Sequence, residues 1–198
     1  MTSEQIRDPR KDNLLTPANC AVVFIDYQPT QINSIRSMDR AELVDHIVRV
    51  AKTAVLYEVP IVLSTVNVKS GRNQPTIAAL ETVLPHVEVL DRTTINAWED
   101  VQFRAAVMAT GRKKLVMTAL WTEACLTFPT LDAMREGYET YPVVDAVGGT
   151  SVEAHRAALD RVSQAGAQPV SWVQLICELQ RDWARTETAT EFAQILFG

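Results

Sequence analysis

Strand-like segments that alternate with helical segments are the feature of this sequence that most constrains its fold. The run Ala21-Val22-Val23-Phe24-Ile25 is apolar throughout, as in a strand buried on both faces of a parallel sheet. Further strands are expected at 61–65, at 87–90, from Leu115 to the break at Trp121, at 141–144 and at 168–172. Helices are expected between them at 40–58, 76–83 and 100–110, up to Gly137, at about 150–164, and last around Leu175, Ile176, Leu179 and Trp183. The pattern predicts the α/β class.

Six strands in this order predict a three-layer α/β/α sandwich around a six-stranded parallel sheet. Right-handed crossovers leave few strand orders open, and we expect the commonest one, 3-2-1-4-5-6. In that order the first and fourth strands are neighbours, and ligands bind in the crevice beyond their carboxyl ends. The chain has 198 residues, 47% of them hydrophobic, which suffices for one core, so we expect a single domain over 1–198.

Composition and charge exclude several classes of function. The formal net charge is −5 and the basic residues are scattered, so nucleic acid is not an expected partner. No apolar run approaches the ~20 residues that span a bilayer, and no membrane association is expected. The polar start, 1–11, has no apolar core for export, which indicates a cytoplasmic protein. The three cysteines are far apart and outside any Cys-x-x-Cys pair, so neither disulfides nor a zinc site are indicated.

Two chemically active residues follow the two strands that should be neighbours. Asp26 ends the first strand, and Cys125 lies in the turn that leads from the fourth strand into a helix. We expect the positive end of that helix to lower the pKa of the thiol. A thiolate is a good nucleophile, and a carboxylate within hydrogen-bond reach is a suitable general base. The alternative for Cys125 is a small buried core cysteine.

A cation near this pair would favour ionisation of the thiol and keep the carboxylate charged. Arg92, which follows the predicted third strand, is the candidate. The alternative is a surface arginine paired with a nearby acid such as Asp91.

These residues lie in motifs that resemble the isochorismatase-like cysteine hydrolases, most closely their YcaC-type branch. The matching segments are Ile25-Asp26-x-Gln28, Arg92 with Ile95-Asn96-Ala97-Trp98, Trp121-Thr122-Glu123-Ala124-Cys125, and Cys177-Glu178-Leu179-x-Arg181-Asp182-Trp183. The resemblance covers nearly the whole chain. It implies a six-stranded α/β/α sandwich and a catalytic set of Asp26, Arg92 and Cys125, where Arg92 replaces the lysine usual in the wider family. An arginine stays charged, so it can orient Asp26 but cannot shuttle a proton.

The resemblance also implies an oxyanion hole and a substrate pocket. It implies a cis peptide bond between Leu120 and Trp121 that aims the N–H of Trp121, with that of Cys125, at a developing oxyanion. An ordinary packed aromatic is the alternative for Trp121. The expected pocket residues, among which Trp98 is favoured because it lies in the loop that carries Arg92, are Gln28, Ile95, Asn96, Trp98 and Leu120.

No metal and no cofactor are expected. Nicotinamidases, related in fold, have an Asp-x-His-x-x-His cluster, whereas His46, His86 and His155 lie at unrelated spacings. Tyr27-Gln28-Pro29-Thr30 stands where a glycine-rich phosphate loop would follow the first strand.

Two functions remain open. The first is a metal-independent, amidase-like hydrolase that cleaves a C–N bond of a small substrate through a thioester on Cys125. The second is an oligomeric scaffold or small-ligand-binding protein in which the same residues line a little-used pocket. A redox thiol is a narrower third possibility, but no resolving cysteine is evident. By resemblance we expect a homo-oligomer built from dimers, up to an octamer, with the apolar stretch 192–197 as a subunit contact.

Overall fold

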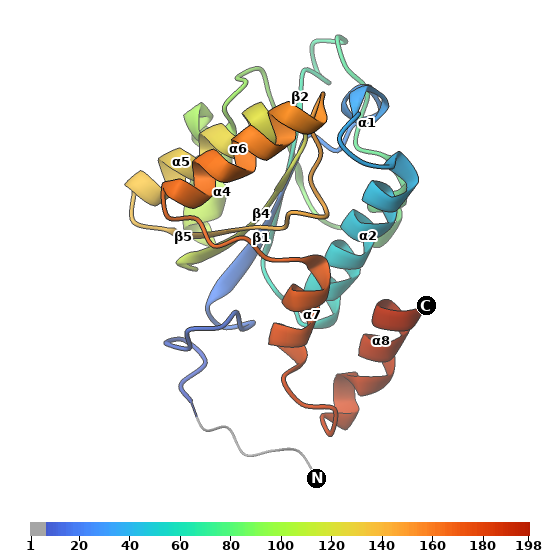
Figure 1. Cartoon of the computed structure of the whole chain (residues 1–198), viewed down its shortest axis with the longest axis vertical. Coiled ribbons are helices and arrows are strands. Elements are labelled where there is room, and N and C mark those ends of the chain that lie inside the picture. The colour runs from blue at the N-terminus through green and yellow to red at the C-terminus, as the bar shows by residue number, and fades with distance from the viewer. Residues whose placement is uncertain (1–6) are drawn as a thin grey trace.

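The structure, a computed structural model, describes residues 7–198 (Figure 1). Its strands are β1 (Cys20–Ile25), β2 (Ile61–Val66), β3 (Val89–Arg92), β4 (Lys114–Ala119) and β5 (Glu139–Pro142). Its helices are α1 (Pro29–Ser34), α2 (Arg40–Leu56), α3 (Ala78–Val83), α4 (Val101–Ala109), α5 (Thr127–Arg135), α6 (Val152–Gln164), α7 (Trp172–Gln180) and α8 (Thr186–Phe197). Two short helical turns are η1 (Ala97–Glu99) and η2 (Thr122–Leu126). The first six residues of the predicted domain 1–198 lie outside the described residues.

The described strands form one parallel sheet in the order β3-β2-β1-β4-β5, so the predicted order is confirmed for five strands. The prediction of a sixth strand at 168–172 is wrong. That segment forms one bridge, between Val143 and Val170. The N–H groups of Gln168 and Val170 donate to the carbonyls of Thr140 and Pro142, but the pairing stops at Ser171, which caps the next helix by accepting from the N–H of Gln174.

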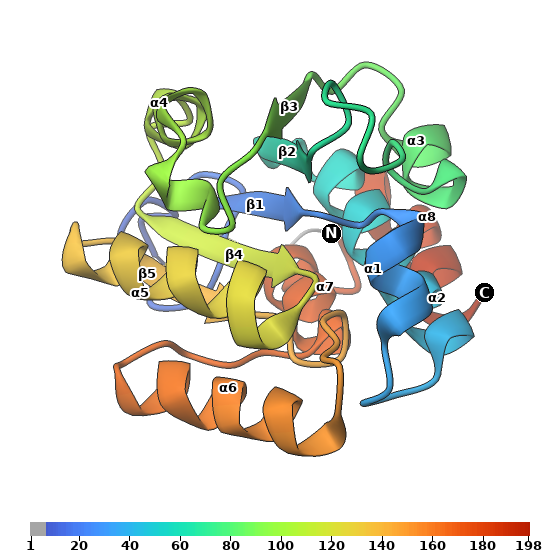
Figure 2. The same ribbon diagram turned by 90° about the horizontal axis from the view of Figure 1, so that it is seen from above.

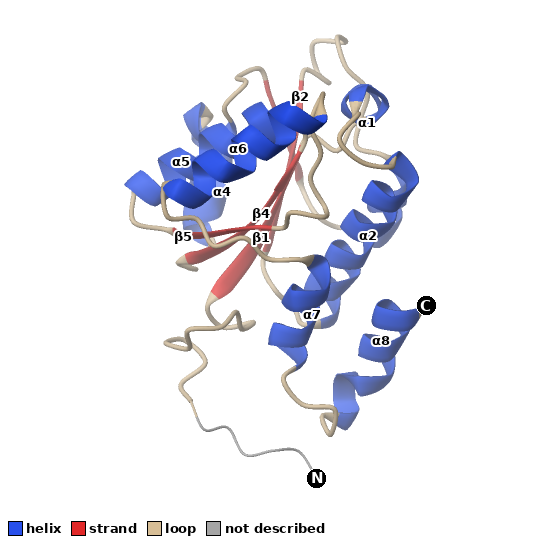
Figure 3. Ribbon diagram, viewed as in Figure 1, coloured by secondary structure: helices blue, strands red, loops and turns tan. Residues whose placement is uncertain are grey.

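Helices cover both faces of the sheet, as predicted, and the three layers are visible in Figure 3. Alternate residues of β1 explain why the strand is apolar throughout. Val22 and Phe24 pack in a cluster with residues of α2 and α7, whereas Ala21, Val23 and Ile25 pack in a second cluster with residues of α4 and α5. Because each face of β1 has its own core, every side chain of the strand is removed from water.

Several element boundaries differ from the predicted ones. β3 begins and ends two residues later than predicted, so Arg92 is the last residue of the strand and not a loop residue. β5 begins two residues early, at Glu139. α7 ends at Gln180 because Arg181 adopts φ 63°, which places Trp183 outside the helix. Among residues 7–198, no helix is both long and apolar enough to cross a membrane.

β1 and β4 lie side by side and point the same way, as Figure 2 shows from above. Ile25 pairs with Ala119, and the N–H of Leu120 donates to the carbonyl of Ile25. The residues that follow these strands, Asp26 and the segment 120–126, therefore leave the sheet at the same edge.

Candidate active site

Asp26 and Arg92 form a buried ion pair at this edge. Arg92 donates from Nη1 to Oδ1 and from Nη2 to Oδ2 of Asp26, both at 2.7 Å. Nη1 also donates to the hydroxyl of Ser64 at 3.1 Å and to the carbonyl of Thr65 at 3.0 Å. The side chains of Arg92 and Asp26 are 1% and 0% exposed. Arg92 is therefore a buried partner of Asp26, and the alternative of a surface arginine paired with Asp91 is wrong.

The contacts with Asp26 keep Arg92 protonated. Burial alone would lower the pKa of Arg92, but its hydrogen bonds to Asp26 and the carboxylate charge outweigh burial and raise that pKa. A two-pronged contact between guanidinium and carboxylate is among the strongest hydrogen-bonded pairs in proteins. Arg92 thus fixes the position of the Asp26 carboxylate and stays protonated.

The backbone of Asp26 has a left-handed conformation, with φ 63°. Its N–H donates to the carbonyl of Ser64, and its own carbonyl accepts from the N–H of Gln28, both within 2.9 Å. Asp is one of the few residues with a side chain that adopts this conformation readily. The chain therefore turns sharply at the end of β1 while both backbone groups of Asp26 stay hydrogen-bonded.

Cys125 lies in η2, a π-helical turn, just before α5. The N–H of Leu126 donates to the carbonyl of Trp121, the five-residue spacing of a π-helix. Pro129 cannot donate to the carbonyl of Cys125, which a regular helix would require, so the helix is irregular there. Cys125 therefore lies on an irregular turn between β4 and α5, as predicted from its position after the fourth strand, and the residue is 7% exposed.

The protonation of Cys125 differs from the expectation. Burial, and then the charge of Asp26 and a hydrogen bond to it, raise the pKa of the thiol to about 12. Arg92 and the backbone N–H of Trp121 act in the opposite direction but do not outweigh them. The expected net lowering by the helix end is therefore wrong, because desolvation and the adjacent carboxylate dominate. Near neutral pH the residue is a neutral thiol beside the carboxylate of Asp26.

Trp121 has two separate contacts near the thiol. Its backbone N–H faces the sulfur of Cys125, and the peptide bond from Leu120 to Trp121 is cis. Its ring Nε1 donates to the hydroxyl of Ser34, in α1, at 2.6 Å. A backbone donor therefore lies beside the sulfur, and the indole ring is held by another element.

The other predicted pocket residues make structural contacts. The amide of Gln28 donates to the carbonyls of Val66 and Gln74 and accepts from the N–H of Val66, which ties the end of β1 to the loop after β2. Asn96 caps η1 by accepting from the N–H of Trp98 and also donates to Asp132. Three further positions complete the set: Trp98 packs edge-on against Phe103 and Tyr138, Leu120 is fully buried, and Ile95 is 66% exposed.

A polar network behind Cys125 was missed by the sequence reasoning. Glu123 accepts from the N–H and the hydroxyl of Thr150, at 3.0 and 2.6 Å. Thr122 hydrogen-bonds to Nδ1 of His155 at 2.9 Å, and its N–H donates to the carbonyl of Gly148. These contacts anchor the turn of Cys125 to the start of α6. The only signal in the sequence was the position of Glu123, two residues before the cysteine.

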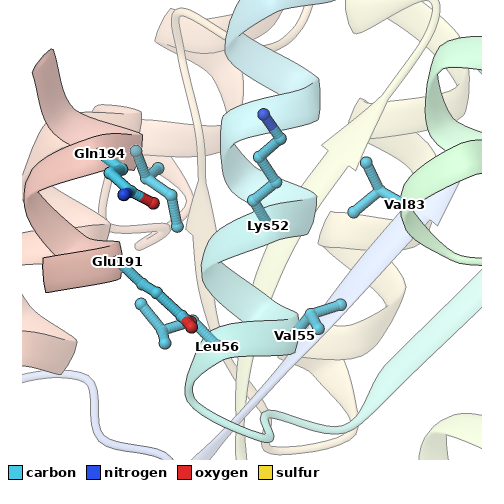
Figure 4. A pocket seen from close by; sticks show the side chains of 7 residues that line it. Lys52, Val55, Leu56, Val83, Glu191 and Gln194 are labelled. Atoms are coloured by element: carbon cyan, nitrogen blue, oxygen red, sulfur yellow. The ribbon is translucent and has the colours of Figure 1, made fainter. Parts of the chain in front are cut away.

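A cavity away from Asp26 and Cys125 lies between α2, α3 and α8 (Figure 4). It has a volume of about 340 Å³ and is lined by Lys52, Val55, Leu56, Val83, Glu191, Gln194 and Ile195. None of these side chains is a thiol or an imidazole, and no group of three or more His, Cys, Asp and Glu within residues 7–198 could hold a metal ion. The cluster of Asp26, Arg92 and Cys125 is the candidate for covalent chemistry, because it combines a thiol, a carboxylate and a cation that holds the carboxylate.

Comparisons with known proteins agree with this geometry. The family model described as the isochorismatase domain matches residues 20–174, which include all three residues of the cluster. The chain is 33% identical over 184 residues to the probable hydrolase YcaC of Escherichia coli (strain K12), covering 92% of this chain and 85% of that protein.

Two solved structures share the fold over most of the chain. YcaC from Pseudomonas aeruginosa, with hexane-2,5-diol and covalent acrylamide, is 30% identical with a TM-score of 0.84, covering 93% of this chain and 96% of that one. YcaC from Escherichia coli, an octameric hydrolase of unknown specificity, is 29% identical with a TM-score of 0.84, covering 93% and 95%. The match to the domain and the identity to YcaC show that this chain belongs to the isochorismatase family of hydrolases.

Proposed function

We propose that this protein is a cysteine hydrolase that cleaves a small amide-like substrate at its C–N bond through a thioester on Cys125. The observation that carries the proposal is the carboxylate of Asp26 beside the thiol of Cys125, whose pKa it raises, while Arg92 holds that carboxylate through two hydrogen bonds. A thiol with a pKa of about 12 is neutral near pH 7, so a base must take its proton during the attack. Asp26 is the group in position to do so.

The first half of the reaction forms the thioester. The sulfur of Cys125 attacks the carbonyl carbon while its proton passes to Asp26, and the electron pair of the C=O bond moves to the oxygen. The N–H groups of Trp121 and Cys125 donate to this oxyanion. When the intermediate collapses, the C–N bond breaks and the amine leaves with the proton from Asp26, which is again a carboxylate.

The second half releases the acid. Asp26 takes a proton from water while the water oxygen attacks the thioester carbon. The second tetrahedral intermediate expels the sulfur of Cys125, which recovers the proton from Asp26. Arg92 stays charged throughout, so its role is to fix Asp26 and to stabilise its negative charge.

The class of substrate follows from the chemistry and from the relatives. A buried, neutral thiol paired with a carboxylate suits attack on an uncharged acyl group, because no further charge need be buried before the attack. The Pseudomonas YcaC holds covalent acrylamide, a small primary amide that is also reactive toward thiols. We therefore propose small uncharged amides, hydroxamates and ureides as the first substrates to test.

Intact-mass spectrometry tests this function directly. Incubation with a panel of these compounds should yield an acyl adduct on the wild type and free amine or ammonia in solution. Both signals should be lost in Cys125→Ser and in Asp26→Asn. Cys177→Ser is the matched control, since it removes the exposed thiol and should leave the adduct and the turnover unchanged. Binding without adduct or turnover in every variant would instead support the ligand-binding alternative.

We also propose that the chain forms a homo-oligomer, as the octameric Escherichia coli YcaC does. Trp183 and Phe197 are 63% and 74% exposed, and their rings stack with centroids 6.4 Å apart. Large exposed apolar side chains that lie together are typical of interaction surfaces. Phe192, in contrast, is buried within the chain, so only part of the stretch 192–197 is free for a subunit contact. Sedimentation velocity measures the assembly state.

A further inference from the structure

A basic pocket lies at the edge of the sheet opposite Asp26 and Cys125. It has a volume of about 280 Å³, and its lining residues are Arg10, Ala18, Asn19, Gly111, Arg112, Lys113, Lys114 and Glu139. Four of these eight residues are cationic and one is acidic, in a chain whose net charge is −5. Because Lys114 begins β4 and pairs with Cys20, the pocket lies one strand length, about 20 Å, from the candidate active site.

Lys114 forms the rigid part of this pocket. Its ammonium donates to the carbonyls of Asp12 and Asn13, both at 2.7 Å, and to that of Leu14 at 3.4 Å. It also lies 4.0 Å from the carboxylate of Glu139. With these partners the donors of Lys114 are used, so its charge remains but its hydrogen bonds are not free for a ligand.

Arg112 and Arg10 supply the free donors. Nε of Arg112 is buried from solvent and has no hydrogen-bond partner among the described residues. The charge of Arg112 also acts, with that of Lys114, to lower the pKa of the buried Cys20 thiol against the effect of burial. Among the described residues the guanidinium of Arg10 has no hydrogen bond or ion pair, and its backbone N–H donates to the carboxylate of Asp8. Lys113 lies over the ring of Tyr138. A buried, unpaired donor costs free energy until an acceptor binds it.

We propose that this pocket binds a small oxyanion, the phosphate or carboxylate group of a small metabolite, with Arg112 as its main ligand and Arg10 closing over it. The planar donors of a guanidinium match the oxygen atoms of both groups. An anion here would be a counter-ion for the guanidinium of Arg112 and would relieve the repulsion among the four cations that line the pocket, where Glu139 is the one acidic lining residue. The site is separate from the chemistry proposed at Cys125.

Thermal unfolding and calorimetry test the site with inorganic phosphate and with succinate, each against sodium chloride at equal ionic strength. An oxyanion at ten times its Kd should raise the Tm of the wild type by about 3–6 °C relative to chloride. The stronger of the two probes identifies the phosphate or the carboxylate as the preferred group. Equal Tm values in phosphate, succinate and chloride would overturn the proposal.

Variants that remove either a positive or a negative charge from the pocket test whether the oxyanion binds there. Arg112→Gln should weaken binding of the stronger probe about 10- to 100-fold. Glu139→Gln, which removes the one acidic group, should strengthen it about two- to fivefold. Arg72→Gln makes the same change at an exposed site outside the pocket and should leave the affinity unchanged, as should Cys125→Ser. Arg10→Gln replaces Arg112→Gln if the latter fails to fold. Equal affinities of the Arg112 and Arg72 variants, or weaker binding in Glu139→Gln, would contradict the assignment.

Discussion

The two edges of the sheet each bury a cation, and they neutralise it in different ways. At the carboxyl edge Arg92 is paired with one charged partner, the carboxylate of Asp26. At the amino edge Lys114 is surrounded by three neutral carbonyls, and its nearest carboxylate, of Glu139, is 4.0 Å away and half exposed. The first arrangement balances charge and positions a base, whereas the second leaves a net positive field. This difference separates an edge suited to acid–base chemistry from an edge suited to holding an anion.

The largest expected effect comes from removing each cation. Arg92→Met leaves the carboxylate of Asp26 buried without a partner, and we expect the free energy of unfolding to fall by about 3–5 kcal/mol. Lys114→Met leaves only neutral carbonyls without donors, and we expect a fall of about 1–3 kcal/mol. Urea unfolding near pH 7 measures both.

Two controls make this pair of substitutions decisive. Arg72→Met changes an exposed arginine and should stay within about 0.5 kcal/mol of the wild type. The double variant Asp26→Asn with Arg92→Met removes both charges, keeps a residue that tolerates the left-handed backbone at position 26, and should be more stable than Arg92→Met alone. If Arg92→Met and Lys114→Met lower the stability equally, the contrast between the two edges does not hold.

The next effect concerns the thiols, one at each edge. Burial raises the pKa of both Cys20 and Cys125 to about 12, but only Cys125 has a carboxylate in hydrogen-bond contact. Asp26→Asn removes the charge that raises the pKa of Cys125 and leaves Arg92, which lowers it. We therefore expect alkylation of Cys125 by iodoacetamide at pH 8 to become about tenfold faster for each unit by which the pKa falls, although hydrolysis is lost.

Peptide mapping by mass spectrometry in a Cys177→Ser background separates the two remaining thiols. The rate at Cys125 in the wild type should rise with pH well above pH 9, because the folded thiol ionises only near pH 12. Cys20 should be unaffected by Asp26→Asn. Slower alkylation of Cys125 in that variant would show that the carboxylate does not hold the thiol in its neutral form.

The smallest effect tests the anchor of the turn that carries Cys125. Glu123→Ala removes the acceptor for both donors of Thr150, and the turn should shift relative to Asp26. We expect acylation of Cys125 to slow by about tenfold, since small displacements of reacting groups have effects of this size or more. Glu123→Gln keeps one acceptor oxygen and should be closer to the wild type.

The matched control is Glu153→Ala, at an exposed position of α6. It should leave both the Tm and the acylation rate unchanged. A loss of Tm in Glu123→Ala with no change in the rate per folded molecule would indicate a purely structural role for Glu123.

Local patterns predicted the fold well where strands are uniformly buried and poorly where pairing is short. β1 is apolar in every residue and was predicted to within one residue. β3 and β5 have four residues each, and their ends depend on hydrogen bonds to neighbouring strands that alternation does not reveal. The segment 168–172 has strand-like composition, but the helix cap at Ser171 ends its pairing after Val170 and leaves one bridge.

The candidate site shows a similar division. That Asp26 and Cys125 would lie close together follows from the strand order, because β1 and β4 are neighbours in a parallel sheet and their carboxyl ends lie at the same edge. The protonation of Cys125 could not be predicted, because desolvation depends on how completely the surrounding helices cover the thiol. The contact of Glu123, in η2, with Thr150, in the loop before α6, links residues 27 positions apart, and no local pattern predicts such a contact.

The left-handed backbone of Asp26 restricts which sequences this position can accept. At φ 63° a β-branched or bulky residue is strained, whereas Gly, Asn and Asp are tolerated. Of these three, only Asp carries a carboxylate. In a saturation library, selection for folding alone should therefore retain this small group, and added selection for activity should reduce it to Asp. The shape of one turn thus limits which residues could replace Asp26 in this chain during evolution.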